Sequence, residues 1–158
     1  MESLENLIQS FQRVSWVIAQ QAKGLTHEDM MLQLPFRSNC FNWVLGHVVN
    51  SRYNILNALG ETAVSSKKYE RYGIGSDPVS HDDSVIQSEQ LLTAINETQE
   101  QIANALKNAS PDLLNSIHNE ERNQTVLDFV TFLQWHESYH CGQFEILRQL
   151  AGTDDAII

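Results

Sequence analysis

The chain contains few residues that interrupt helices, with 3 prolines and 7 glycines among its 158 residues. Proline removes a backbone donor and glycine weakens a helix interior, so this scarcity leaves room for long helices. No segment alternates between apolar and polar residues for long enough to predict a convincing β-strand. The sequence therefore favours an all-α protein.

Cysteine is also scarce, because only Cys40 and Cys141 are present. Two cysteines do not make a disulfide framework, which argues against a small disulfide-rich secreted protein. The first residues, MESLENLIQSFQRVSW, have neither the basic segment nor the apolar run of a signal peptide. No window reaches the run of about 18 apolar residues that a membrane span needs. We therefore expect a cytoplasmic protein without a membrane partner.

Basic residues are fewer than acidic ones. The chain has 10 Lys and Arg and 20 Asp and Glu, which gives a net charge of −10. Such a surface repels phosphate backbones, so we expect no nucleic-acid partner. Three of the basic residues, Lys67, Lys68 and Arg71, gather within five positions. They form either a small anion-attracting lid or an ordinary solvated loop. The length fits one domain over residues 1–158.

Apolar residues recur at intervals of three and four in four segments, which predicts four helices. The first is expected from residue 4 to about Gly24. A loop with Pro35 follows it. Asn39 is a suitable N-cap for the second helix, which covers 40–59 and stops at Gly60.

The third helix is expected over 80–109, where Ser80 and Asp83 resemble a capping box. The connection before it, residues 60–79, is long for a bundle, and long connections are often functional or mobile. The connection after it, residues 110–124, has room for a short turn of helix.

The fourth helix is expected to begin at Thr125, with Asp128 three residues later, and to end at Gly152. Helices of about 20–28 residues each span roughly 30–40 Å. Four such helices with apolar stripes and connecting loops predict a four-helix bundle.

The last predicted helix places His136 and His140 four residues apart in the stretch WHESYHCGQFEILRQ. At about 100° per residue, both rings fall within the apolar stripe that contains Leu133 and Phe144. One buried histidine satisfied by a hydrogen bond is common. Two on one buried face are harder to satisfy, because each unpaired buried polar group costs about 1–3 kcal/mol. A shared metal ion removes that cost for one nitrogen of each ring.

A tight metal site needs a third ligand, and the other histidines are His27, His47, His81 and His118. Only His47 is predicted to lie in the middle of a helix. Its position is about 100° from the centre of that helix's apolar face, so the periodicity also allows an ordinary, partly buried histidine.

The letters HESYH also match the H-E-x-x-H signature of zinc metalloproteases, in which Glu137 would be the general base. The remaining context of a peptidase is missing, since no further histidine follows and no strand-rich half precedes the motif. A ferritin-like di-iron site also fails, because the residue three before His47 is Val44 rather than glutamate.

The stretches NWVLGHVV and HESYHCGQFEILRQLAG resemble the DinB superfamily of metal-binding four-helix bundles. The resemblance covers nearly the whole chain in helix order and is most specific over residues 136–152. It implies that His47, His136 and His140 bind one divalent metal ion and that the protein is a homodimer. Cys141 departs from the pattern, because many relatives have arginine there. Its thiol has either a packing role or a redox or ligand role.

Gln143 lies seven residues after His136 and so returns to the same stripe. The resemblance supports a hydrogen bond from Gln143 to a ligand histidine or to the metal-bound species; the alternative is a polar residue at the end of the bundle. Gly142 would allow close approach of a neighbouring helix. Trp43 and Trp135 either wall the site or pack in the core or an interface.

Three imidazoles leave at least one coordination position open, as in catalytic sites. Because characterised members of the superfamily use thiols such as bacillithiol, mycothiol or glutathione, the resemblance implies a metal-dependent thiol S-transferase acting on small electrophiles. Its partners would be a small thiol and an electrophile, with Glu137 or Gln143 orienting or deprotonating the thiol. The alternatives are a hydrolase with Glu137 as base and a non-catalytic, stress-related metal-binding bundle. Zinc or nickel is expected, with iron or manganese as further choices.

Overall fold

The computed structural model describes residues 4–61, 66–80, 85–155 and 157. The predicted capping residue Asp83 and the candidate ligand His81 lie outside these residues. In the described chain the long helices are α1 (Leu4–Ala22), α3 (Phe41–Ala58), α4 (Ser88–Asn108) and α6 (Val126–Leu150). The short elements are α2 (His27–Met30), the 3-10 helix η1 (Ser66–Tyr72), α5 (Pro111–Asn115), β1 (Ile117–Asn119) and β2 (Gln124–Thr125).

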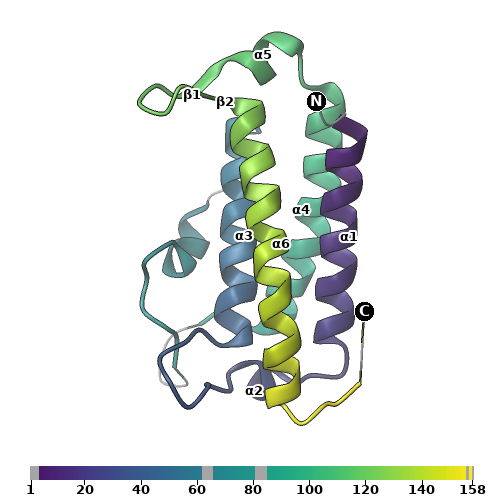
Figure 1. Ribbon diagram of the computed structural model, residues 1–158, viewed down its shortest axis with the longest axis vertical. Coiled ribbons are helices and arrows are strands. Elements are labelled where there is room, and N and C mark those ends of the chain that lie inside the picture. The colour runs from purple at the N-terminus through teal and green to yellow at the C-terminus, as the bar shows by residue number, and fades with distance from the viewer. Residues whose placement is uncertain (1–3, 62–65, 81–84, 156, 158) are drawn as a thin grey trace.

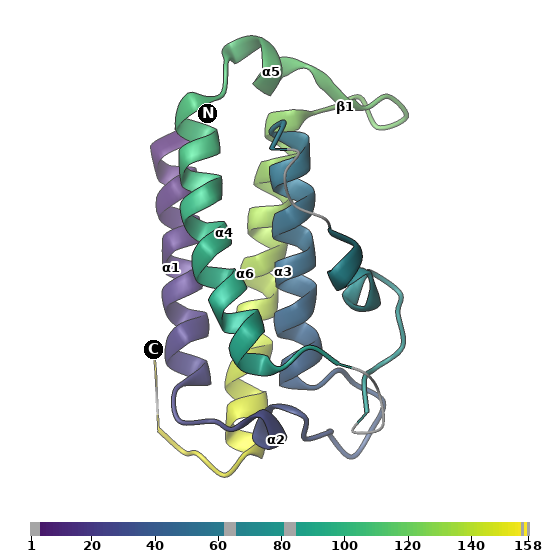
Figure 2. The same ribbon diagram turned by 180° about the vertical axis from the view of Figure 1, so that it is seen from behind.

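The four long helices pack side by side as the predicted all-α bundle (Figures 1 and 2). Helices α4 and α6 each contact both α1 and α3, so α1 and α3 lie on opposite sides of the bundle. Helices α1 and α6 run in one direction, and α3 and α4 run in the other (Figure 1). Because α3 and α4 are parallel neighbours, the chain must return along the bundle between them. This return explains the long connection that contains η1.

The connection is held to α3 by one buried aromatic side chain. Tyr72, at the end of η1, is fully buried, and its ring lies against Gly46 of α3. A Cβ atom placed on Gly46 would lie 2.5 Å from Tyr72 Cγ, far inside contact distance. Only glycine therefore lets the Tyr72 ring approach the helix this closely.

The start of α6 agrees with the sequence prediction. Thr125 Oγ1 accepts a hydrogen bond from the Asp128 backbone N–H at 3.1 Å, and Asp128 Oδ2 accepts one from the Thr125 N–H at 3.0 Å. This capping box satisfies two backbone donors that the first turn cannot pair internally. It fixes the beginning of the helix that carries His136 and His140.

The starts of α3 and α4 differ from the prediction. The N-cap of α3 is Cys40 rather than Asn39, because Cys40 still has an extended backbone. Helix α4 begins at Ser88, not near residue 80, and residues 85–87 are not helical. The Ile86 N–H donates to the Tyr72 hydroxyl at 2.9 Å, and the Ile86 carbonyl accepts from Asn42 Nδ2 at 2.9 Å. These tertiary hydrogen bonds replace the helical ones.

The connection between α4 and α6 contains the expected turn of helix, α5, whose first turn is capped by Ser110. It also contains the antiparallel pair β1 and β2, which the sequence prediction of no strand missed. These strands have three and two residues, too few to show a period of two. Within the described residues, no helix has the length and hydrophobicity needed to cross a membrane.

Candidate metal centre

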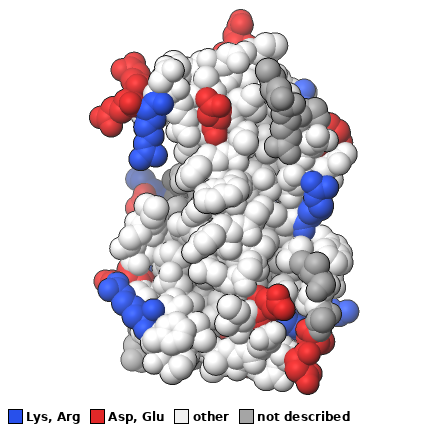
Figure 3. Space-filling model, in the orientation of Figure 1, with Lys and Arg blue, Asp and Glu red and all other residues white. Residues whose placement is uncertain are grey.

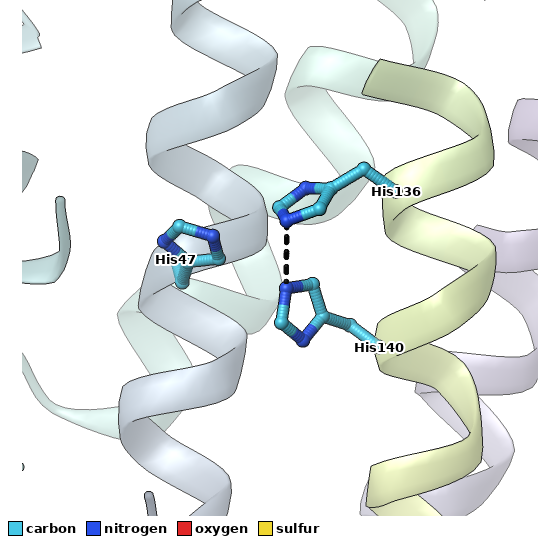
Figure 4. A group of neighbouring side chains, drawn as sticks. All are labelled: His47, His136 and His140. Carbon is cyan, nitrogen blue, oxygen red and sulfur yellow. Dashed lines mark hydrogen bonds between the residues drawn. The ribbon is translucent and has the colours of Figure 1, made fainter. Parts of the chain in front are cut away.

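Three histidines meet between α3 and α6. His47 comes from α3, and His136 and His140 come from adjacent turns of α6. The ring of His47 lies 5.1 Å from that of His136 and 5.0 Å from that of His140, measured between centroids. One nitrogen from each ring can be chosen so that all three lie within 4.8 Å of one another. Figure 4 shows the three rings facing a common space between the two helices.

Hydrogen bonds on the outer side of two rings determine which nitrogen carries the proton. His47 Nδ1 donates to the Tyr72 carbonyl at 2.7 Å, and His140 Nδ1 donates to Gln143 Oε1 at 2.6 Å. Both acceptor oxygens can only accept. In the neutral rings, Nε2 of His47 and of His140 therefore carries a lone pair. This is the arrangement found around metal-ligating histidines.

His136 supplies the independent sign that a cation fits here. Its Nε2 lies 3.1 Å from His140 Nε2, and its Nδ1 is buried without a hydrogen-bond partner. If the His136 proton is on Nε2, the Nδ1 lone pair is buried and unpaired. If the proton is on Nδ1, its N–H is buried without an acceptor and two lone pairs face each other. A shared ion held by His136 Nε2 and His140 Nε2 would remove the repulsion between these two lone pairs.

Burial keeps all three rings neutral near pH 7. Loss of solvent lowers the pKa of His47 and of His136. It also lowers the pKa of His140 to about 4, although the bond to Gln143 acts in the opposite direction. Neutral imidazoles bind metal without first releasing a proton. The three rings are therefore ready ligands for a divalent ion.

Aromatic side chains surround the three rings. Trp43 is buried and stacks on His47, with 4.9 Å between the ring centroids. It therefore walls the site, which is one of the two roles that the sequence left open for it. Phe132 lies parallel to His136 at 6.2 Å, and the ring edge of Tyr139 meets His140 at 5.3 Å. Trp135 does not join this wall, because its ring contacts are with Phe132 and Tyr139 rather than with the three histidines. Each of the three rings therefore has an aromatic neighbour.

Glu137 is not brought to the histidines. Its carboxylate is fully buried and accepts two hydrogen bonds from Arg52, from Nε and from Nη2, each at 2.9 Å. Arg52 also donates to the Ile95 carbonyl of α4 and to Ser15 Oγ of α1. The pair therefore ties all four long helices together inside the bundle. The expected role of Glu137 as general base has no support in this placement.

The other candidate ligands lie elsewhere. His27 Nδ1 is 2.9 Å from Ser88 Oγ at the start of α4, and the exposed His118 stacks on Phe129. Cys141 is a free, half-buried thiol, and burial raises its pKa to about 12.

Gly142 and the basic cluster were also singled out from the sequence. A Cβ atom on Gly142 would meet no atom within 4 Å, so Gly142 does not serve a close helix approach. In the basic cluster, Lys68 Nζ lies over the Tyr69 ring at 5.6 Å, and Arg71 donates to the Asp77 carbonyl at 3.4 Å. Both contacts are local to the connection and its η1 segment. They do not link the cluster to the three histidines.

The sequence reading missed Tyr72 and Arg52. Tyr72 lies in the connection and would not be associated with His47 from periodicity. Gly46, directly before His47 in the middle of a helix, was the available signal, because an interior glycine with a packing reason marks a close approach. Arg52 lies on the buried face of α3, where a charged residue implies a buried partner.

Comparison with known proteins places this geometry in a family. A search of the curated proteins finds no match to the chain. The family model of the DinB superfamily matches residues 11–144. The match includes all of α3 and the part of α6 that carries His136, His140 and Gln143. The chain, with its three histidines arranged to hold a metal ion, belongs to the DinB superfamily.

Proposed function

We propose that the protein is a divalent-metal-dependent thiol S-transferase that acts on small electrophiles. The observation that most supports this proposal is the convergence of three imidazole nitrogens. Among the described residues, the cluster contains no fourth side-chain ligand. Three protein ligands and an open position are typical of catalytic zinc sites. A divalent ion held there would lower the pKa of a bound thiol or water and so would supply a nucleophile near neutral pH.

The protein's own residues prepare the site in three ways. The Tyr72 carbonyl and Gln143 fix the tautomer and orientation of His47 and His140. Burial keeps the rings unprotonated, and the Trp43 ring excludes water from one side of His47. Imidazole ligands suit zinc or nickel first, with iron or manganese as further choices. We also propose a cytoplasmic location, since both cysteines are free thiols, as in a reducing compartment.

In the proposed reaction with a haloarene, a sulfur–carbon bond forms while the carbon–halogen bond breaks. The thiol proton and the halide ion leave to solvent, so no oxidant or reductant is needed. Hydrolysis with Glu137 as base is less favoured, because both Glu137 oxygens accept from Arg52. A metal-binding bundle without catalysis is the remaining alternative.

The test is a product analysis with 1-chloro-2,4-dinitrobenzene as electrophile. Zinc- or nickel-loaded protein is incubated with bacillithiol, mycothiol or glutathione, and the thioether and 2,4-dinitrophenol are quantified. The proposal expects thioether above the uncatalysed rate with the parent and none above it with His136→Ala. Dinitrophenol formed without thiol would favour the hydrolase. Metal-loaded protein without either product for any thiol would favour the non-catalytic bundle.

We further propose that the protein is a homodimer that pairs through the outer face of α6. Phe132, Trp135 and Tyr139 are exposed there and form a continuous ladder, with ring centroids 5.9 and 6.5 Å apart. Charged side chains on this side of the molecule lie mainly toward its margins (Figure 3). Two copies of a chain with net charge −10 can meet most easily at such an uncharged patch.

A further inference from the structure

An open cavity lies beside Gln143, the residue that accepts from His140 Nδ1. It has a volume of about 220 Å³ and is lined by residues of the 31–40 loop and of the last turns of α6. Its apolar walls are Leu34, Phe36, Ile146 and Leu147. Phe36 and Ile146 remain 66% and 56% exposed, so the cavity has an apolar mouth that solvent reaches.

The same cavity contains three polar side chains, Ser38, Asn39 and Gln143. Gln143 Oε1 accepts from His140 Nδ1, which leaves the Gln143 amide NH₂ to face other groups. Among the described residues, no hydrogen bond is made by that NH₂ group or by the side chains of Ser38 and Asn39. An apolar cavity lined by a few polar side chains is typical of small-molecule sites.

We propose that this cavity binds an uncharged, ring-sized apolar molecule that carries an acceptor oxygen, and that Gln143 couples its binding to His140. The size follows from the volume, because an apolar cavity of about 150 Å³ already holds benzene. The lining contains no charged side chain, which argues against an ionic ligand. The acceptor oxygen would accept hydrogen bonds from the side chains of Ser38, Asn39 and Gln143.

Coupling follows from the two ends of the Gln143 amide. A ligand oxygen that accepts from the NH₂ end polarises the amide, and its carbonyl end then binds His140 Nδ1 more strongly. Hydrogen bonds on the outer nitrogen of a ligand histidine change its basicity toward the metal. Binding in the cavity therefore alters the metal's environment without direct contact with the ion.

The molecule offers a matched control cavity. A second cavity of about 250 Å³ lies between α1 and α4, lined by residues that include Ile18, Ala19 and Leu92. None of its lining residues belongs to α3 or α6 or contacts the three histidines. A ligand that merely seeks apolar space should enter both cavities.

The experiment is a titration of metal-free protein with nitrobenzene, a neutral arene with acceptor oxygens, followed by NMR. We expect saturable shifts of the Ile146 and Leu147 methyl groups and of the Gln143 amide. Phe36→Ala and Ile146→Ala, both at exposed wall positions, should weaken binding about tenfold or more. Ala19→Trp, which fills the control cavity at an exposed position, should leave binding unchanged. Absent shifts, or binding that Ala19→Trp removes and Ile146→Ala keeps, would overturn the site.

The coupling is tested on cobalt-loaded protein. Nitrobenzene should change the visible spectrum of bound cobalt in the parent, and it should not do so in Gln143→Met. A spectral change that persists in Gln143→Met would overturn the coupling. These readouts need no turnover. If nitrobenzene binds but no thioether forms, only the proposed function fails. If thioether forms but nitrobenzene does not bind, only this inference fails.

Discussion

Gly46 determines where Tyr72, the hydrogen-bond partner of His47, can lie. The fully buried Tyr72 ring occupies the space that any larger side chain at residue 46 would need. The same tyrosine provides the carbonyl that accepts from His47 Nδ1. A packing contact with Gly46 and a hydrogen bond to His47, a candidate metal ligand, are thus made by the same residue of the connection.

We therefore predict that Gly46→Ala weakens both metal binding and folding. Displacing Tyr72 should cost about 1–3 kcal/mol of unfolding free energy through overpacking. Loss of the His47 contact should reduce metal affinity about 10- to 100-fold. Urea unfolding and metal titration measure the two effects. Gly142→Ala is the control, because it meets no atom within 4 Å and should gain roughly 0.5–1 kcal/mol from helix propensity. Parental metal affinity in Gly46→Ala would contradict the link.

Cys141 directly follows His140, a candidate metal ligand, but is not expected to act on substrate. Burial raises the pKa of its thiol to about 12, so it stays protonated at neutral pH. Cys141→Ser should keep metal content and turnover, whereas His136→Ala should lose both. Metal analysis and the thioether assay on the same preparations provide the comparison. An inactive Cys141→Ser protein with normal metal content would refute this.

At the scale of single residues, the sequence indicated the candidate ligands better than the residues that form hydrogen bonds with them. His136 and His140 followed from spacing, whereas His47, the one remaining histidine predicted in mid-helix, needed the family resemblance as well. The Gln143 contact with His140 is confirmed, because both lie on one helix three residues apart. The Tyr72 contact with His47 could not be predicted, since its 25-residue separation depends on how the connection returns along α3.

Helices α3 and α6 are joined inside the bundle by the ion pair of Arg52 and Glu137. Both side chains are fully buried, and the carboxylate accepts two hydrogen bonds from the guanidinium. Removing one partner of such a pair leaves the other charge buried and uncompensated. The pair therefore affects the relative placement of the two helices that carry the histidines.

We predict that Glu137→Ala lowers the unfolding free energy by about 3–5 kcal/mol, measured by urea denaturation of metal-free protein. The double substitution Arg52→Met with Glu137→Met is the matched control and should lose clearly less, because no unpaired charge remains. A Glu137→Ala protein within about 1 kcal/mol of the parent would contradict this account.

Among the elements, local capping was easier to predict than tertiary pairing. The Thr125 and Asp128 box that starts α6 is confirmed, because all its groups lie within four residues. The predicted start of α4 near residue 80 was wrong. Asn42 and the Tyr72 hydroxyl form hydrogen bonds with the Ile86 backbone, which keep Ile86 out of a helix. Both partners are distant in sequence, so apolar periodicity carries no sign of them.

For the whole molecule, the proposed dimer predicts a concentration-dependent mass that depends on the α6 ladder. Sedimentation at micromolar concentration should give a dimer for the parent and a monomer for Trp135→Glu, since a charge would be buried in the interface. Ile74→Glu is the control, because Ile74 is 91% exposed and lies in the connection between α3 and α4 rather than in α6. A monomeric parent would remove the proposal.

The bundle as a whole was predicted from four apolar stripes, but its helix directions were not. Apolar periodicity shows that a helix has a buried face and does not show which neighbour covers it. The long connection was the one sign that α3 and α4 run in parallel, because such neighbours need a return along the bundle (Figure 2). The same return brings the Tyr72 carbonyl to His47.

The central claim is that His47, His136 and His140 hold one divalent ion. It is tested most directly by X-ray absorption at the zinc edge, on protein loaded with one equivalent of zinc. The account predicts three imidazole nitrogens at about 2.0–2.1 Å, and two in His140→Ala if any zinc is retained. A spectrum with fewer than three imidazoles in the parent, or one unchanged by His140→Ala, would contradict it.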